Sequence, residues 1–130
     1  MILKTLLAIS LMLNLPVYAK RDYVPPSPKI VKFYTGIPEK DNWVTVPEGT
    51  KEITINVEAL NTETVVFWLI PTGTETWYER KLIGYDIKDD KDNNFSLTWN
   101  IPQHLHDHLE VQALGENEIA RSSINITSTP

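Results

Sequence analysis

The sequence predicts an all-β protein, an antiparallel β-sandwich of seven or eight short strands. Segments in which apolar and polar residues alternate recur along the chain, and turn signals separate them at spacings of about 8–12 residues. No stretch places apolar residues at i, i+3, i+4 and i+7 over three helical turns, so no helix is expected between the strands. Strands at this spacing without intervening helices are typical of an antiparallel sandwich or barrel.

The first 19 residues are typical of a secretory signal peptide. Lys4 gives a positive start, and the run from Leu6 to Leu15 is nearly all apolar. Val17 and Ala19 occupy the −3 and −1 positions of a cleavage site. The apolar run is about ten residues long, whereas a helix needs ~20 to cross a bilayer. We therefore expect cleavage after Ala19, a secreted or periplasmic location, and a bacterial source.

The rest of the chain divides into an extended Pro-rich leader, residues 20–29, and one domain, residues 30–130. The leader holds three prolines and has no apolar core of its own. The predicted strands are Ile30–Tyr34, Trp43–Val46, Ile53–Ala59, Val65–Ile70, Trp77–Tyr85, Phe95–Ile101, Leu109–Ala113 and Ile119–Ile126.

Two of these strands show different patterns of burial. The strand from Ile53 to Ala59 alternates strictly, as a strand buried on one face does. The strand from Val65 to Ile70 is apolar on both faces, which predicts a central strand covered on both sides. Its register stays open, because either of two sets could point inward. The two sets are Val65, Phe67 and Leu69, or Val66, Trp68 and Ile70.

The composition excludes several functional classes. The chain has 130 residues, with 12 Lys+Arg against 17 Asp+Glu, a formal net charge of −5 and no cysteine. Such an acidic chain lacks the basic face that neutralises phosphates, so nucleic acid is not an expected partner. Without cysteine there is no disulfide, no thiolate metal site and no cysteine nucleophile. No segment after the signal peptide is apolar enough to span a membrane.

Five segments together resemble a bacterial immunoglobulin-like domain of the fibronectin type III or adhesin-repeat kind. They read EGTKEITINVEA, VVFWLIPTGT, KLIGYD, NNFSLTWNIP and HLEVQALGENEIARSSINIT, within about residues 44–127. In such domains the third strand carries a buried aromatic residue, here Phe67 or Trp68, and the sixth ends in V-x-A, here Val111 and Ala113. The resemblance implies an immunoglobulin-like sandwich that binds or spaces through its surface. It implies no chemistry, because this scaffold hosts many unrelated roles.

All three histidines fall in one short segment, His104-Leu105-His106-Asp107-His108. In an extended strand, residues i, i+2 and i+4 share one face. Three imidazoles on one face can ligate Zn²⁺ or Cu²⁺, and Asp107 is close enough in sequence to be a further ligand. The alternative is a solvent-exposed polar corner between strands, in which the three imidazoles diverge.

The acidic loop Asp86–Asn94 is a second candidate cation site. The residues that could ligate Ca²⁺ are Asp86, Asp90, Asp92 and Asn94. An EF-hand is excluded, because Phe95 stands where that loop needs Gly and Ile101 where it needs Glu. A looser Ca²⁺ site in an inter-strand loop remains. The alternative is a charged hairpin loop that keeps the sheet soluble.

A third candidate surface is aromatic. If Trp68 faces away from the core and Trp77 or Tyr78 lies on the next strand, their rings form a flat platform. Such a platform stacks on a sugar ring or anchors a protein partner. The alternative is that the N-terminal segment Tyr23–Tyr34 folds over these rings.

No motif in the sequence indicates catalysis. G-x-S-x-G, H-E-x-x-H and a Gly-rich phosphate loop are all missing, and the carboxylates lie in predicted loops. We therefore expect a non-catalytic binding or structural module that needs no cofactor. Two alternatives stay open. One is a periplasmic Zn²⁺- or Cu²⁺-binding protein that uses His104, His106 and His108; the other is an adhesin, inhibitor or secretion accessory that captures a protein or glycan partner.

Overall fold

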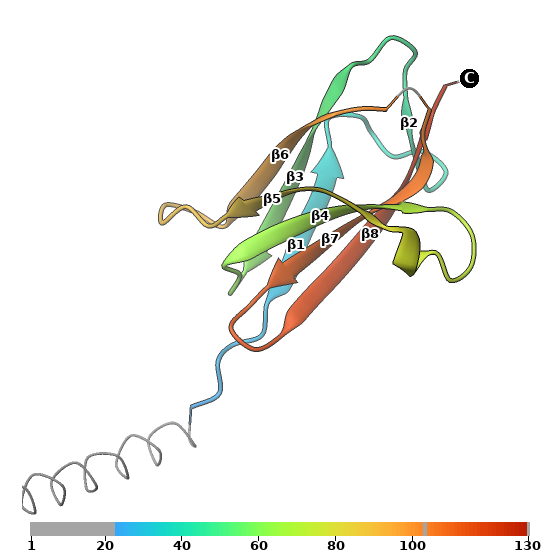
Figure 1. The fold of residues 1–130 in the computed structure, drawn as a ribbon. Coiled ribbons are helices and arrows are strands. Elements are labelled where there is room, and N and C mark those ends of the chain that lie inside the picture. The colour runs from blue at the N-terminus through green and yellow to red at the C-terminus, as the bar shows by residue number, and fades with distance from the viewer. Residues whose placement is uncertain (1–22, 103, 130) are drawn as a thin grey trace, which may run out of the picture.

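The computed structural model describes residues 23–102 and 104–129, which form two packed β-sheets (Figure 1). Eight strands and one short 3-10 helix make up this part of the chain. The prediction of an all-β, sandwich-like fold is confirmed. The predicted signal peptide lies outside the described residues. Within them, no helix has the length and apolar character needed to cross a membrane.

The smaller sheet has three strands in the order β1-β3-β6, and its neighbours are antiparallel. Its strands are β1 (Lys29–Thr35), β3 (Glu52–Leu60) and β6 (Asn94–Asn100). The larger sheet has the order β2-β8-β7-β4-β5, in which β2 runs parallel to β8 and the other pairs are antiparallel. Its strands are β2 (Trp43–Val46), β8 (Ile119–Ser128), β7 (His106–Leu114), β4 (Thr64–Pro71) and β5 (Lys81–Ile87).

The core lies between the sheets and is built from alternate residues of their strands. In β3 the four apolar residues predicted to face inward are all buried: Ile53, Ile55, Val57 and Ala59. In β4 the inward set is Val65, Phe67 and Leu69, so Trp68 points to the outer face. Phe67 and Phe95 are the two largest fully buried side chains, and they come from different sheets.

The predicted strand from Trp77 to Tyr85 is wrong in its first part. Residues Trp77–Glu79 form a 3-10 helix, η1, and β5 begins only at Lys81. The Glu79 amide donates to the Thr76 carbonyl at 2.9 Å, which closes the turn. The chain therefore leaves the sheet after β4 and returns to it at Lys81.

The described part of the leader lies along one end of the sandwich. Asn61 Nδ2 donates to the Ser27 carbonyl at 3.1 Å, and the Tyr23 hydroxyl donates to Glu116 Oε2 at 3.4 Å. The next segment, β1, pairs with β3 in the smaller sheet. The N-terminal segment therefore does not cover Trp68, which faces outward from the other sheet.

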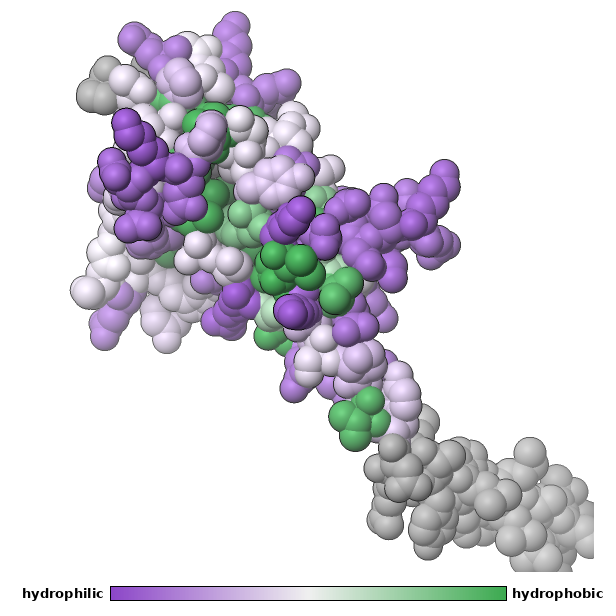
Figure 2. Space-filling view, turned by 180° about the vertical axis from the view of Figure 1, so that it is seen from behind, coloured by the Kyte–Doolittle hydropathy of each residue, from purple (hydrophilic) through white to green (hydrophobic). Residues whose placement is uncertain are grey.

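Seen from behind, hydrophilic side chains dominate the surface (Figure 2). The loop between β5 and β6 projects from the body as a hydrophilic arm, on the right in this view. This loop, residues 88–93, carries most of the acidic residues proposed as calcium ligands.

Candidate functional site

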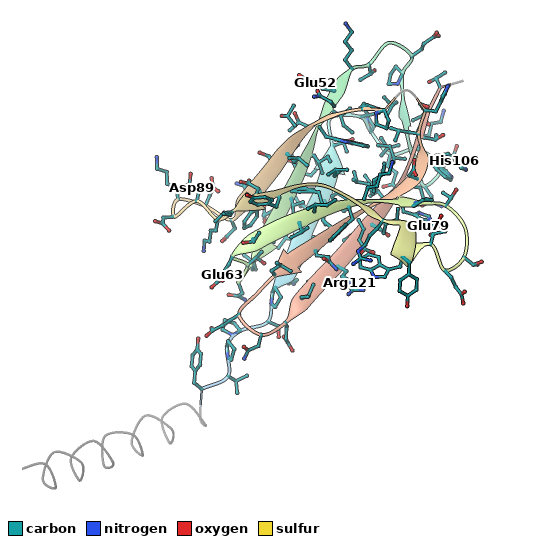
Figure 3. The ribbon with its side chains drawn as sticks, in the orientation of Figure 1. Glu52, Glu63, Glu79, Asp89, His106 and Arg121 are labelled. Carbon is teal, nitrogen blue, oxygen red and sulfur yellow. The ribbon has the colours of Figure 1, made fainter. Side chains whose placement is uncertain are left out.

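The outer face of the five-stranded sheet gathers two tryptophans and two arginines. Trp68 of β4 points outward, and Trp77 reaches over it from η1. Arg80 follows η1, and Arg121 comes from the outer face of β8 (Figure 3). We call these four residues the Trp–Arg cluster.

The guanidinium of Arg80 contacts a ring of each indole. Its guanidinium carbon is 4.7 Å from the ring centroid of Trp68 and 4.2 Å from that of Trp77. The guanidinium carbon of Arg121 lies 5.2 Å from the ring centroid of Trp77. Cations at these distances from an aromatic face are attracted by its quadrupole. Two side-chain hydrogen bonds fix the arrangement, from Arg80 Nη1 to the Trp77 carbonyl at 3.1 Å and from Trp68 Nε1 to Gln112 Oε1 at 2.8 Å.

Glu110 of β7 lies directly opposite Trp68 in the β4–β7 pair, beneath the cluster. Burial raises the pKa of its carboxyl, and the positive charges of Arg121, Arg80 and His108 partly offset this rise. Arg80 Nε and Glu110 Oε2 are both buried and have no hydrogen-bond partner among the described residues. The Trp–Arg cluster and Glu110 beneath it therefore hold a donor and an acceptor that no other described residue satisfies.

The expected flat aromatic platform takes a different form. The rings of Trp68 and Trp77 are 6.0 Å apart and inclined at 58°, so they are not coplanar. Tyr78 is 89% exposed and stands outside the pair. Arg80 contacts both indoles, because η1 turns the chain back over β4 instead of extending it. Ligand binding by Trp68, Trp77 and Tyr78 stays a prediction.

The structure brings two of the three histidines to one face. His106 and His108 alternate along β7 and both point to the outer face, whereas His104 precedes the strand. His104 instead lines a hollow of about 430 Å³ at one end of the sandwich. Asp107 points to the other side of β7 from its neighbours, and its Oδ2 accepts a hydrogen bond from the His106 amide at 2.9 Å.

Both histidines on β7 already contact other side chains. The His106 ring stacks on Trp43, with centroids 4.9 Å apart and an interplanar angle of 14°. His108 Nδ1 lies 2.7 Å from Asn125 Oδ1, and Asn125 in turn donates to the Asn42 carbonyl at 3.1 Å. Within residues 23–102 and 104–129, no three His, Cys, Asp or Glu side chains are grouped to hold a metal ion. Zn²⁺ or Cu²⁺ binding stays a prediction.

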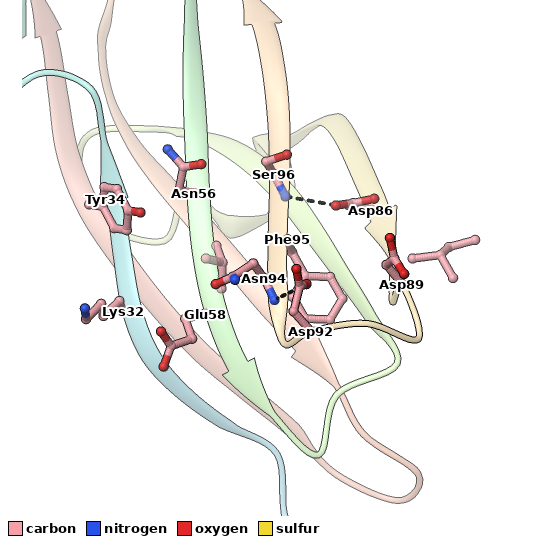
Figure 4. A pocket seen from close by; sticks show the side chains of 12 residues that line it. Lys32, Tyr34, Asn56, Glu58, Asp86, Asp89, Asp92, Asn94, Phe95 and Ser96 are labelled. Atoms are coloured by element: carbon pink, nitrogen blue, oxygen red, sulfur yellow. Dashed lines mark hydrogen bonds between the residues drawn. The ribbon is translucent and has the colours of Figure 1, made fainter.

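The acidic loop borders a polar hollow of about 480 Å³ over the three-stranded sheet (Figure 4). Lys32, Tyr34 and Glu58 line its other side. Two of the four proposed calcium ligands already accept a hydrogen bond from a backbone amide through one carboxylate oxygen. Asp86 Oδ2 accepts from the Ser96 amide at 2.9 Å, and Asp92 Oδ1 accepts from the Asn94 amide at 3.0 Å. Calcium binding by Asp86, Asp90, Asp92 and Asn94 stays a prediction.

Sequence reasoning missed three residues that the fold adds to these sites, namely Arg80, Arg121 and Trp43. Arg121 and Trp43 reach their aromatic or imidazole partners from other elements, so local spacing gives no signal for them, whereas Arg80 lies only three residues from Trp77. Gln112 carries a weak signal, because it is polar yet buried in a strand whose neighbours are apolar. Its hydrogen bond to Trp68 explains that burial.

Comparisons with known proteins bear on the fold alone. No family model and no curated protein matches the chain. A superoxide reductase (neelaredoxin) from Ignicoccus hospitalis is similar in structure, with a TM-score of 0.51 and 10% identity over 79% of this chain and 80% of that one. So is a chain from the structural study of T cell specificity and activation by the bacterial superantigen toxic shock syndrome toxin-1. Its TM-score is 0.51, with 12% identity over 78% of this chain and 100% of that one. Both similarities support a two-sheet, all-β fold.

Proposed function

We propose that the chain is an exported, non-catalytic, immunoglobulin-like module that captures a protein partner through the outer face of its five-stranded sheet. The immunoglobulin-like assignment is supported by the division of the strands. Immunoglobulin folds place strands A, B and E on one sheet and C, F and G on the other. With β2 and β5 counted as additions, β1, β3 and β6 match the first set, and β4, β7 and β8 the second.

The Trp–Arg cluster is the observation that carries the binding proposal. Tryptophan and arginine are the residues most enriched where alanine substitution weakens protein interfaces. Here two of each meet on one face, and the strongly exposed Tyr78 stands beside them. Such side chains lose little rotamer freedom on binding, because stacking and hydrogen bonds already hold them in place.

A protein partner fits the cluster better than a sugar ring does. Stacking on a sugar requires an open, flat aromatic face. The guanidinium of Arg80 covers one face of Trp68 and one face of Trp77, and the rings are inclined at 58°. The surface therefore resembles an interface anchor rather than a sugar platform.

The binding proposal is tested by affinity capture from the secreted and periplasmic fractions of the source organism, followed by titration of the captured protein. Trp77→Ala removes the outer indole, and Tyr34→Ala serves as the control. Tyr34 is a 52% exposed aromatic residue of the opposite sheet. We expect Trp77→Ala to weaken binding about 30-fold, the size of a hot-spot loss, and Tyr34→Ala to leave it unchanged.

Two outcomes would overturn the proposal. In the first, wild type and Trp77→Ala retain the same proteins with the same affinity. In the second, Tyr34→Ala alone loses them, which would assign binding to the smaller sheet. Export is tested separately, since the mature protein recovered from the organism should begin at Lys20.

A further inference from the structure

The two sheets have four edge strands, and each carries some protection against pairing; on β5 this is Lys81 and the irregularity at Ile83. Edge strands expose unpaired N–H and C=O groups, which proteins block by short length, bulges, lysines or covering groups. β2 is only four residues long. β1 carries Lys29 and Lys32 and an irregularity between Ile30 and Lys32. On β6, the backbone amide of Ser96 already donates a hydrogen bond to the Asp86 carboxylate.

The fourth edge, β5, is apolar and exposed. Leu82, Tyr85 and Ile87 are 56%, 61% and 64% exposed. They pair with Trp68, Val66 and Thr64 of β4, so all three point to the outer face. Among the described residues, β5 forms a hydrogen-bonded ladder with β4 alone, and it also contacts β6, where Asp86 accepts from the Ser96 amide.

We propose that β5 is a self-association edge, on which the β5 strand of a second copy of this chain adds in antiparallel orientation. The sequence of the strand is complementary to itself. In one register, Lys81 stands opposite Asp86 of the second copy, and Leu82 stands opposite Tyr85 of the second copy. Two-fold symmetry repeats both contacts, which gives two ion pairs and two apolar pairs.

The facing of the side chains selects this register. Paired residues of adjacent strands must point to the same side of the sheet. Lys81 and Asp86 pair with inward residues of β4, whereas Leu82 and Tyr85 pair with outward ones. A shift by one residue would oppose inward and outward side chains. A shift by two would place Lys81 opposite Lys88 of the second copy, and like charges directly opposite are destabilising.

The irregularity in β5 is compatible with this pairing. One residue, Ile83, has no partner in β4 and packs against the core. In the proposed register, Ile83 of each copy lies next to the two-fold axis. The residue pairs on either side of the axis therefore stay aligned. The dimer joins two five-stranded sheets into one, with both Trp–Arg clusters on the same face. The inference does not depend on what those clusters bind.

Charge exchange across the edge tests the proposal. We expect sedimentation velocity of the purified protein to show a concentration-dependent dimer. Lys81→Asp and Asp86→Lys should each raise the dimer dissociation constant by about tenfold or more, because each opposes like charges twice. An equimolar mixture of the two variants should form a heterodimer, in which every pair is again complementary. Lys88→Asp, one residue beyond the end of β5, should dimerise as wild type does.

If Asp86→Lys disturbs the fold, Asp86→Asn provides a second test of the ion pair. An asparagine can still accept from the Ser96 amide, so the sandwich keeps this contact while the charge is lost. A wild-type protein that stays monomeric up to its solubility limit would overturn the proposal. So would a dimer that survives both charge reversals, since it would use another surface. Trp77→Ala should leave the dimer intact, which separates this inference from the proposed function.

Discussion

Gly84 of β5 packs so closely against Leu97 of β6 that a Cβ atom on Gly84 would lie 2.6 Å from Leu97 Cδ1. The Cδ2 and Cγ atoms of Leu97 would be 2.8 and 3.3 Å away, so more than the tip of the side chain is involved. Glycine lets β5 approach the opposite sheet at this point. The same approach brings Asp86 to the edge of β6, where it accepts from the Ser96 amide.

Gly84→Ala should destabilise the fold. Extra volume in a packed site costs about 1–3 kcal/mol, which corresponds to a fall in Tm of several degrees for a domain of this size. Thermal unfolding followed by circular dichroism measures the loss. Gly36→Ala is the matched control, because a Cβ there meets no atom within 4 Å.

The Leu97→Ala background shows whether the contact is the cause. Removing the leucine side chain leaves room for the new methyl group, so Gly84→Ala should cost less in that background. An equal loss in both backgrounds would contradict this account. It would point instead to the backbone of β5.

Arg80→Ala should loosen the Trp–Arg cluster. The substitution removes the cation that contacts both indoles, a contribution of about 0.5–2 kcal/mol. We expect a lower Tm and a weaker near-ultraviolet circular dichroism signal, because Trp68 and Trp77 lose the group that holds them in place.

Arg80→Lys separates charge from shape. Lysine keeps the positive charge but lacks the planar group that stacks on a ring. We expect a near-ultraviolet signal between those of wild type and Arg80→Ala. A lysine variant identical to wild type would show that charge alone organises the cluster.

The alternation of side chains predicted most of the sandwich. In β3, strict alternation between Ile53 and Ala59 was sufficient, because one face of that strand is buried and the other is largely exposed. In β4 both faces are apolar, so alternation left two registers open. The structure buries Val65, Phe67 and Leu69 and leaves Trp68 on the outer face, where it donates to Gln112 of β7, a partner 44 residues away.

The geometry of the predicted sites differs from expectation where the expectation relied on strand geometry outside a strand. His104 lies before β7 begins, so it does not share the face of His106 and His108. Trp77 lies on η1, where packing against Trp68 and Arg80 outweighs the β-propensity of WYERKLIGY. Both outcomes depend on tertiary contacts that the local sequence does not contain.

Glu110→Gln should stabilise the protein at neutral pH. Burial raises the pKa of Glu110 above its usual value, so the folded chain holds this proton more tightly than the unfolded chain does. The associated stabilisation is complete below the unfolded pKa and is lost as pH rises through the folded pKa. Ionised Glu110 therefore lowers the free energy of unfolding at pH 7, and glutamine removes this cost.

The pH dependence distinguishes this cause from a packing effect. We expect the gain in Tm at pH 7 to shrink toward zero at about pH 3.5, where the glutamate is protonated in both states. Glu48→Gln, at an exposed turn, serves as the control for a change of net charge. A gain that is constant across this range would assign the effect to packing rather than to ionisation.

Metal binding by the histidines makes a prediction that the structure sharpens. If His104, His106 and His108 close on one ion, His106 must leave the Trp43 ring and His108 must release Asn125. Stoichiometric Zn²⁺ or Cu²⁺ should then raise Tm, because a ligand of the native state stabilises it.

Tryptophan emission separates a three-histidine site from a two-histidine one. Zn²⁺, which does not quench by redox chemistry, should change the emission of Trp43, since the stacked imidazole must move away from it. His104→Ala should abolish both the emission change and the rise in Tm if three imidazoles are required. A full response in His104→Ala would limit the site to His106 and His108. No rise in Tm for the wild type would leave His106 as a stacking partner of Trp43 that holds β2 against β8 and β7.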